Sequence, residues 1–469
     1  MAFVMDLRDN SNSCGTATPC RFVSFRLPFF VFFFLLFALG TDPPSVFARD
    51  CWLSVHGAGR RDGTSRENAY AVSANKTEAS AEQCWAETSP DGTMYVLEGR
   101  YSVEEGTFWK LKISGQHSGP ANDPAIKKKL IGVGRVTIVG SRQVPYDPAW
   151  KESGETWIEL REGARQLHIE NFDVSRIQLG ILADAGGYKD LSFKGLRFQD
   201  TRQNLVLYGH PECRDLQSCK GKNAESLSSR IRIENVHGMR YSKRHIRLTH
   251  GISDVTVLNS SADAQFLDGD FAVGFDVDNP SHDIEFRNCT ARGNLFSGSD
   301  YWNGDGFKSE SETENIRWVR CAAFDNADAG FDVKGPQALL EQVLASGNSR
   351  NIRIWSPRET LLDHVVSTHS RYFGGDGTPS GLWVQGMARC QACTIFANPV
   401  AIHLEKNEAP FCRLTLQDSW ITADRQEKLL LREENTEIHE IRTQMRSSGF
   451  ELEAKGIPEN EGRASSAPL

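Results

Sequence analysis

Carboxylate and amino side chains gather in one short stretch of the chain, between residues 300 and 335. Two related motifs supply most of them: Asn-Gly-Asp-Gly-Phe-Lys at 303–308 and Asn-Ala-Asp-Ala-Gly-Phe-Asp-Val-Lys at 326–334. Carboxylates that converge repel one another unless a proton or a cation lies between them. Oxygen ligands in such number suit Ca²⁺ better than zinc or copper. We therefore expect a calcium site, with candidate ligands Asp305, Asp328, Asp332, Asp325 and Asp300.

Short strands must position these side chains, because the sequence around them repeats. Phe307 and Phe331 lie 24 residues apart, Phe275 lies 32 residues before Phe307, and Ile352 lies 21 residues after Phe331. Runs in which apolar and polar residues alternate recur between these positions, as expected of half-buried strands. Repeats of this length with Asn and Gly turns and no helical periodicity are typical of a parallel β-helix. The sequence thus predicts an all-β solenoid.

Such a solenoid would place the residues that follow the inward-pointing Phe and Ile side chains on one outer face. Adjacent coils lie about 4.8 Å apart, so four side chains would form a column: Asp276, Lys308, Asp332 and Arg353. The column is either a surface ion-pair network of little energetic value or one side of a catalytic site. For the catalytic interpretation, the candidate bases are Arg353, Lys308 and Lys334. The candidate substrate-binding residues are Arg247, Trp302 and Tyr301.

Composition divides the chain into four regions. Residues 1–48 contain an apolar run of about fourteen residues, a length that favours a secretory signal peptide over a membrane span, with an uncleaved signal anchor as the alternative. Residues 49–126 are expected to form an N-terminal cap and the first coils, and residues 127–423 the catalytic β-helix. Residues 424–469 are expected to be a charged segment in a helical register, up to residue 443, and then a disordered tail.

Export would place the cysteines in an oxidising compartment, where disulfides persist. The expected bridges are Cys51–Cys84 and Cys213–Cys219. Two cysteines at equivalent positions of successive repeats are expected to pack as small apolar residues: Cys289 and Cys321. The Cys-x-x-Cys pair at 390–393 is either half of a zinc site or a pair without a metal, and no second Cys/His pair stands at suitable spacing.

The charge of the chain bears on its partners. The formal net charge is −8 and the sequence pI is about 5.9, so no general basic field favours a nucleic-acid partner. Three Asn-x-Ser/Thr sequences mark candidate N-glycosylation sites, at Asn75, Asn259 and Asn288. We expect a secreted monomer that has no membrane partner unless the N-terminal segment is an anchor.

The central motifs carry a resemblance to a known family. Together with Asp-Gly-Thr-Ser-Arg-Glu-Asn-Ala at 62–69 and Tyr-Val-Leu-Glu-Gly-Arg-Tyr at 95–101, they resemble the family 9 polysaccharide lyases. These are pectate-lyase-like, right-handed parallel β-helix proteins, and the likeness covers the cap and most of the coils. It implies one Ca²⁺ held by aspartates at 305, 328 and 332.

Two positions depart from the family's pattern. Ala329 stands where a further aspartate is expected, so Asp325 or Asp300 would have to replace that ligand. Arg353 aligns best with the family's basic lysine. Arginine is a poor base because its pKa exceeds about 12, so Arg353 ranks first by alignment and Lys308 second by chemistry.

The resemblance implies β-elimination on a uronate-containing, pectate-like glycan. Calcium would neutralise the substrate carboxylate, a base would take the C5 proton, and the 4-O oxygen would leave. Two other functions stay open. One is a glycoside hydrolase of the polygalacturonase type, with Asp305 and Asp328 as its acid pair, and the other is a catalytically inactive β-helix that binds glycans.

Overall fold

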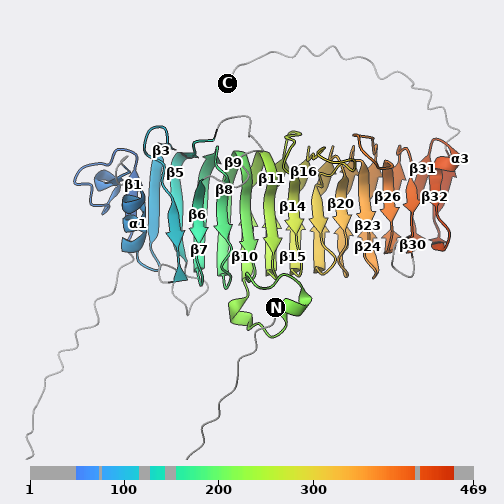
Figure 1. Ribbon diagram of the computed structural model, residues 1–469, viewed down its shortest axis with the longest axis horizontal. Coiled ribbons are helices and arrows are strands. Elements are labelled where there is room, and N and C mark those ends of the chain that lie inside the picture. The colour runs from blue at the N-terminus through green and yellow to red at the C-terminus, as the bar shows by residue number, and fades with distance from the viewer. Residues whose placement is uncertain (1–48, 73–76, 116–126, 143–154, 407–411, 448–469) are drawn as a thin grey trace, which may run out of the picture. The chain divides into compact units, whose positions relative to one another are not determined.

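The computed structural model describes residues 49–72, 77–115, 127–142, 155–406 and 412–447. The signal peptide, the acceptor Asn75 and the C-terminal tail from residue 448 lie outside the described residues, so these expectations stay predictions. In the described part, the strands pair with one another in parallel ladders, coil upon coil (Figure 1). The fold is the right-handed parallel β-helix that the sequence predicts.

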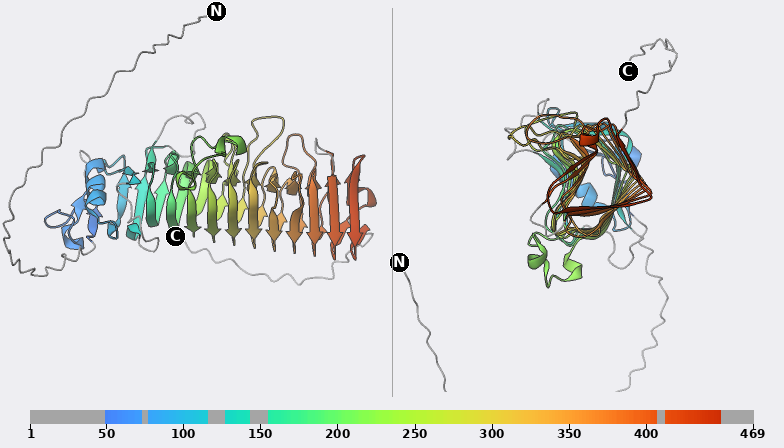
Figure 2. Two further views of the ribbon diagram at one scale, coloured as in Figure 1. Left: turned by 90° about the horizontal axis from the view of Figure 1, so that it is seen from below. Right: turned by 90° about the vertical axis from the view of Figure 1, so that its right-hand side faces the viewer.

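Three parallel sheets enclose the core, and the end-on view shows their triangular cross-section (Figure 2, right). The long strands β3, β5, β7, β9 and β11 bend and contribute to more than one sheet. The first sheet contains β1 (Cys51–Ser54), β2 (Tyr70–Ala71), β3 (Thr93–Ser102), β5 (Lys128–Val139), β7 (Arg165–Ser175), β9 (Lys189–Tyr208), β10 (Ser229–Glu234), β12 (Ser253–Leu258), β15 (His282–Arg287), β18 (Glu314–Val319), β21 (Leu339–Glu341), β24 (Thr360–Asp363), β27 (Met387–Gln391), β30 (Cys412–Gln417) and β33 (Thr436–Ile441).

The second sheet continues these long strands and then uses short ones. It contains the later parts of β3, β5, β7 and β9, then β11 (His237–Thr249), β13 (Ser261–Asp263), β16 (Thr290–Arg292), β19 (Ala322–Phe324), β22 (Leu344–Ser346), β25 (Val366–Thr368), β28 (Thr394–Phe396), β31 (Trp420–Ala423) and β34 (Gln444–Ser447). The third sheet contains β4 (Leu111–Ile113), β6 (Thr156–Leu160), β8 (Leu179–Ala183), the ends of β9 and β11, β14 (Val273–Val277), β17 (Phe307–Ser309), β20 (Ala329–Val333), β23 (Arg350–Ile354), β26 (Ser380–Val384), β29 (Ile402–Leu404) and β32 (Leu430–Arg432).

The third sheet has the register that the sequence predicts. Phe275, Phe307, Phe331 and Ile352 pair in succession and point into the core. The three phenyl rings stack with centroid separations of 4.9 and 4.8 Å. The neighbouring outer column therefore also forms, and it runs through Asp276, Lys308, Asp332 and Arg353.

A ladder of buried asparagines fixes the turns that lead from the second sheet into the third. The Asn294 side chain donates to Asn326 Oδ1 at 2.7 Å, and the Asn326 side chain donates to Asn348 Oδ1 at 2.7 Å. Asn326 and Asn348 also accept the backbone N–H of the asparagine before them in the ladder. Because these amide groups satisfy one another inside the solenoid, the strands that follow them start from a fixed position.

Helices are short and lie at the ends and edges of the solenoid: α1 (Thr77–Glu87), α2 (Leu216–Cys219), α3 (Gln426–Leu429), η1 (Arg66–Asn68) and η4 (Ala224–Ser226). Helix α1 packs against β1 and β4 and buries Cys84 and Trp85, so it covers the first coil. The sequence did not predict this helix, which lies inside the predicted N-terminal cap. No helix in the described part of the chain is long and apolar enough to cross a membrane.

The helical register expected at 424–443 is wrong. Only Gln426–Leu429 is helical, and strands β32, β33 and β34 carry the solenoid one coil further, to Ser447. The charges that suggested a solvated helix instead pair between coils. Arg413 Nε lies 2.7 Å from Glu437, and Arg442 binds Asp418. A charge run on the outer side of a strand has the same composition as one on a helix, which explains the error.

The cysteine predictions are confirmed. Cys51–Cys84 and Cys213–Cys219 are disulfide-bonded, and Cys289 and Cys321 are free and buried at equivalent positions of successive coils. The pair at 390–393 forms a third disulfide, which removes the zinc alternative because both sulfurs are used. Asn259 and Asn288 are exposed in neighbouring turns, with a hydrogen bond of 3.0 Å between their side chains.

Candidate functional site

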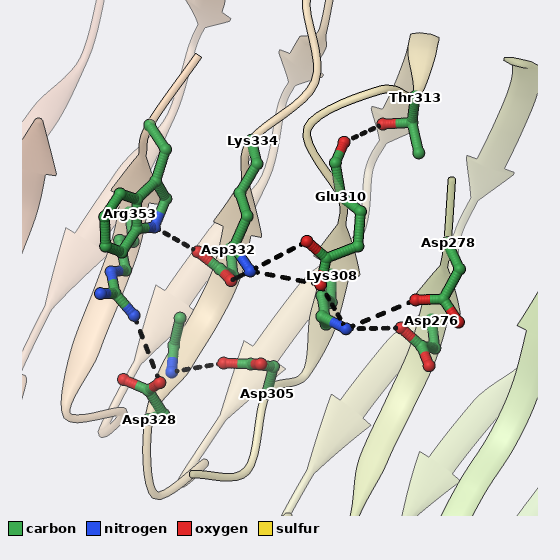
Figure 3. A network of polar contacts seen from close by, with 12 residues as sticks. Asp276, Asp278, Asp305, Lys308, Glu310, Thr313, Asp328, Asp332, Lys334 and Arg353 are labelled. Atoms are coloured by element: carbon green, nitrogen blue, oxygen red, sulfur yellow. Dashed lines mark hydrogen bonds and ion pairs between the residues drawn. The ribbon is translucent and has the colours of Figure 1, made fainter. Parts of the chain in front are cut away.

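Acidic and basic side chains crowd the outer face of the third sheet, from the end of β11 to β23. Figure 3 shows them as one continuous set, with Asp276 and Asp278 at one end and Arg353 at the other. Although they lie outside the core, most are buried by one another and by the loops at the edge of the sheet. Interactions between these charges are therefore weakly screened by water. Two parts of the set differ in charge.

Lys308 lies at the centre of the first part. Its Nζ is 3.3 Å from Asp276, 3.5 Å from Asp278 and 2.6 Å from Glu310, and its side chain is only 11% exposed. Burial alone would lower the pKa of Lys308, but these three carboxylates outweigh it and raise the pKa well above the ordinary value. Lys308 thus stays protonated and cannot serve as the base that the sequence proposed.

Two arginines of β11 bind the carboxylates Asp276 and Asp278 from the side opposite Glu310. Arg244 Nε donates to Asp276 Oδ2, and Arg247 Nε donates to Asp278 Oδ2 at 2.7 Å. Burial raises the pKa of Asp276, but Arg244, Lys308 and Arg247 together hold it below its ordinary value. Arg247, the predicted substrate-binding residue, is therefore engaged by carboxylates of the protein.

Lys334 extends the first part toward β23. Its Nζ lies 3.2 Å from Glu310 and 3.3 Å from Asp332. Burial opposes protonation, yet these two carboxylates raise the pKa of Lys334, so it is also a poor base. We call this part the balanced ladder, because its four cations meet four carboxylates: Arg244, Arg247, Lys308 and Lys334 with Asp276, Asp278, Glu310 and Asp332.

The second part, which we call the arginine cluster, contains Arg350, Arg353, Asp328 and Tyr301. Arg350 Nη1 lies 2.7 Å and Arg353 Nη1 3.4 Å from the two oxygens of Asp328. The Tyr301 hydroxyl lies 2.8 Å from both oxygens of Asp328 and accepts from Arg353 at 2.8 Å and from Arg350 at 3.0 Å. One carboxylate and one phenol thus hold two guanidinium groups.

Aromatic rings fix the plane of the Arg353 guanidinium. Its Cζ lies 3.9 Å from the centroid of Trp355 and 4.0 Å from that of Trp383. The Trp355 indole also donates to Asp332 Oδ1 at 2.8 Å, which links the cluster to the ladder. The Nε of Arg353 is buried, and no hydrogen-bond partner for it occurs among the described residues. A buried guanidinium donor without an acceptor is costly unless a ligand supplies one.

Asp305 lies beside the cluster, where its surroundings favour the protonated form of its carboxyl. Burial, Asp328 and Asp332 raise the pKa of Asp305 well above its ordinary value, and Lys334 only partly opposes them. One oxygen accepts the backbone N–H of Ala329 at 3.1 Å. Of the carboxylates beside Asp305, only Asp328 contacts the two arginines. The cluster therefore carries one positive charge more than its acids neutralise.

The five predicted calcium ligands do not fit a calcium ion. The structure brings Asp305, Asp328 and Asp332 together, but Asp328 is engaged by two arginines and Tyr301, and Asp332 by Lys334 and Trp355. Asp325 pairs with Arg371 at 3.0 Å in an outer turn, and Asp300 lies in the loop before β17. Among the described residues, no set of three acidic, His or Cys side chains is spaced to hold a metal. Calcium stays a prediction that this donor set argues against.

Two loops at the edge of the third sheet, residues 293–306 and 369–379, cover the arginine cluster. The backbone N–H of Asp376 donates to the carbonyl of Asp300 at 2.8 Å and joins the loops. Trp302 packs against the backbone of Gly374 and Gly375, where a Cβ would collide with its ring. The predicted sugar-binding Trp302 thus holds two loops together, with a cavity beside it lined by Ser297, Gly298, Ser299, Asp300, Gly375 and Asp376. A larger concavity lies on the second sheet, around Arg135 and Arg197, away from this chemistry.

Sequence analysis missed Arg350, Glu310 and the two tryptophans of the cluster. Arg350 pairs directly with Ala329, the position where an aspartate was expected. Extending the predicted register by one coil would have shown that a basic residue pairs with the position where the resemblance expects an acid. Trp355 directly follows the end of β23, the strand of Arg353, and Trp383 pairs with Arg353 on the next coil.

The comparisons with known proteins concern the fold. The sequence matches no protein-family model and no curated protein. In structure, the chain is similar to a pectate lyase, with 13% identity, coverage of 79% of this chain and 78% of that chain, and a TM-score of 0.42. It is also similar to the A-module of a mannuronan C-5 epimerase from Azotobacter vinelandii, with 14% identity, coverage of 84% of this chain and 99% of that chain, and a TM-score of 0.46. A third similar structure is a periplasmic alginate epimerase, with 11% identity, coverage of 76% of this chain and 77% of that chain, and a TM-score of 0.39. Membership of the family 9 lyases stays a prediction.

Proposed function

We propose that this protein acts on an acidic, uronate-containing polysaccharide and cleaves it by β-elimination. One observation supports the proposal most: the arginine cluster holds two buried guanidinium groups against a single carboxylate. A uronate carboxylate would supply the missing negative charge and the acceptor for Arg353 Nε. Arginine is suited to this role because its planar fork binds carboxylates in a fixed orientation.

The same two arginines favour removal of the C5 proton. Negative charge accumulates on the substrate carboxylate as that proton leaves, so donors already aimed at it stabilise the transition state more than the ground state. Arg350 and Arg353 are held in place by Asp328 and by the rings of Trp355 and Trp383. The positive charge that the family resemblance assigns to calcium would thus come from Arg350 and Arg353.

Proton transfer is assigned to three side chains. The Tyr301 oxygen takes the C5 proton as its own proton passes to Asp328, 2.8 Å away. No tyrosinate forms in this relay, which agrees with the raised pKa that burial and Asp328 give Tyr301. Burial raises the pKa of Asp328, which makes it a better acceptor, although Arg353 and Arg350 oppose this. The electrons of the C5–H bond form the C4–C5 double bond, and the C4–O4 bond breaks. O4 leaves with its electron pair and takes the proton of Asp305, so the products are an unsaturated uronide and a new reducing end.

A hydrolase is the second candidate, because burial and its acidic neighbours raise the pKa of Asp305 and favour its acid form beside Asp328. In that reaction Asp305 would protonate the glycosidic oxygen, and Asp328 would activate a water molecule. The two candidates differ in their products, since hydrolysis gives reducing ends without a double bond. Re-protonation at C5 without loss of O4 would be epimerisation, which gives neither product.

The test is an assay of the protein on polygalacturonate and alginate, scored by ultraviolet absorbance of the unsaturated product, by reducing ends and by C5 configuration. Tyr301→Phe is expected to lower the rate of unsaturated product by about 100-fold or more. Tyr95→Phe, a stacked tyrosine on β3, is the control and is expected to keep full activity. Reducing ends without absorbance would overturn the lyase assignment in favour of the hydrolase.

We also propose that the protein is exported and acts as a monomer outside the cell. Three disulfides among the described residues favour an oxidising compartment. The exposed acceptors Asn259 and Asn288 would then be open to glycosylation. Mass determination of the protein purified from its native extracellular medium tests export, cleavage near residue 48 and glycan addition together.

A further inference from the structure

Long loops from three coils meet above two coils that have only short turns. The loops span residues 264–272, 293–306 and 369–379, and the short turns at 325–328 and 347–349 lead to Ala329 and Arg350. Strands β13 and β25 are four coils apart in the second sheet, or roughly 19 Å at the usual strand spacing. Nevertheless the rings of Phe266 and Phe373, from the first and third loops, lie 6.2 Å apart. The loops thus lean toward one another beside the arginine cluster.

This meeting point exposes aromatic rings that folding would ordinarily bury. Tyr372 is 63% exposed and Phe266 is 43% exposed. Phe266 and its neighbour Gln265 have φ angles of 56° and 52°, in the left-handed region that costs a bulky residue about 1 kcal/mol or more. The backbone is therefore strained in a way that presents a phenyl ring to solvent. Exposed apolar side chains that occur together, and not singly, mark binding surfaces.

The exposed rings are held in place by the residues around them. Arg371 lies over the Phe373 ring at 4.6 Å and pairs with Asp325 at 3.0 Å. The Tyr372 hydroxyl donates to the carbonyl of Gly375 at 2.9 Å. An aromatic ring that is already fixed loses little conformational entropy when a ligand stacks on it. We call the three rings, Phe266, Tyr372 and Phe373, the aromatic rim.

The aromatic rim is continuous with the arginine cluster through the middle loop. That loop carries Trp302, which packs on Gly374 and Gly375 next to Tyr372, and Tyr301, whose hydroxyl contacts Asp328. In the same third loop, Gly377 lies directly over the Arg350 guanidinium. A polymer that places one carboxylate in the arginine cluster therefore has its neighbouring residues beside these rings.

We propose that the aromatic rim is a sugar-binding subsite that stacks on pyranose rings of the same polysaccharide chain, next to the residue held by the arginine cluster. The inference rests on the proposed function and names a further part of its binding site. Sugar rings have an apolar C–H face that packs on aromatic side chains, and this contact needs no charge. The rim thus recognises the ring, whereas the arginine cluster recognises the carboxylate.

The test is calorimetric binding of oligogalacturonates and oligomannuronates of two and eight residues to the wild-type chain and to Phe266→Ala/Tyr372→Ala. The double variant is expected to bind the eight-residue ligand about tenfold more weakly, with unchanged binding of the two-residue ligand. The same loss is expected with methyl-esterified oligogalacturonate, because stacking does not depend on charge. Leu216→Ala removes an equally exposed apolar side chain from α2 and is expected to change nothing.

The outcomes separate this inference from the proposed function. If the wild-type chain binds the long ligand and the double variant binds it equally well, the aromatic rim is not a subsite, while the arginine cluster keeps its role. If the wild-type chain binds no uronate ligand of either length, both proposals fall. Thermal unfolding of the double variant guards against a folding artefact. Because alanine keeps the Cβ that strains the backbone at position 266, the melting temperature is expected to stay unchanged.

Discussion

The balanced ladder and the arginine cluster lie on the same sheet and are built from the same residue types, yet they differ in charge. In the ladder, four cations meet four carboxylates, and the buried Asp276 and Lys308 are both held in their charged forms. In the cluster, two guanidinium groups share Asp328, while burial and its acidic neighbours raise the pKa of Asp305. A neutralised network stabilises its own geometry, whereas a network with surplus charge is prepared for a ligand of opposite sign. In the proposed function, the ladder therefore supports the site and the cluster binds the substrate.

The largest effect is expected from a substitution that disrupts the arginine cluster and leaves the balanced ladder intact. Arg353→Ala removes the guanidinium between Trp355 and Trp383, and the rate of cleavage of an acidic polymer is expected to fall by about 100-fold or more. Stability is expected to change little, because Asp328 keeps Arg350 and Tyr301 as partners. Arg317→Ala, which removes a half-exposed arginine of the first sheet, is the control. A variant that keeps full activity would contradict the role of the cluster.

The reverse experiment breaks the ladder. Lys308→Met leaves Asp276, Asp278 and Glu310 without their shared cation, so the free energy of unfolding is expected to drop by about 3–5 kcal/mol. Urea unfolding measures this, with Lys194→Met as the surface control because Lys194 forms one exposed ion pair. The folded fraction is expected to retain most of its activity. Loss of activity at unchanged stability would reassign Lys308 to catalysis.

The pH dependence of the two parts is expected to have opposite signs. The folded pKa of Asp305 lies above its unfolded value of about 3.9, so this group reduces stability as pH rises from that value through its folded pKa. Asp276 has a depressed pKa, so its contribution to stability is lost as pH falls through the acid range.

Asp305→Asn is expected to raise stability at neutral pH by about 1–3 kcal/mol. It is also expected to abolish the fall in cleavage rate on the alkaline side, at a lower maximal rate.

The smallest expected effect is that of chelation. Because Arg350 and Arg353 engage Asp328, one of the expected calcium ligands, a chelator is expected to change the rate by less than about twofold. Asp332→Asn, which leaves Lys334 without one of its two carboxylates, is expected to act through stability. Loss of activity in chelator, restored by calcium and not by magnesium, would show that the cluster rearranges around the ion.

Periodicity predicted the solenoid and its column from Asp276 to Arg353, because spacing between apolar residues fixes which side chains share a face. It did not predict the charge of the site. The raised pKa of Asp305 depends on its burial beside Asp328 and Asp332, which periodicity does not give. Arg350 is found only when Ala329 is paired with the next coil. Helix α1 and strands β32 to β34 were missed because short elements at the end of a solenoid are defined by the coil they cover or continue.

The central claim is that a substrate carboxylate neutralises the surplus positive charge of Arg350 and Arg353. Its most direct test compares binding of fully de-esterified and fully methyl-esterified oligogalacturonates of equal length, in wild type and in Arg353→Ala. The account predicts that esterification weakens binding to the wild-type chain by about tenfold or more and has little effect on the variant. Equal loss on esterification in both proteins would contradict it.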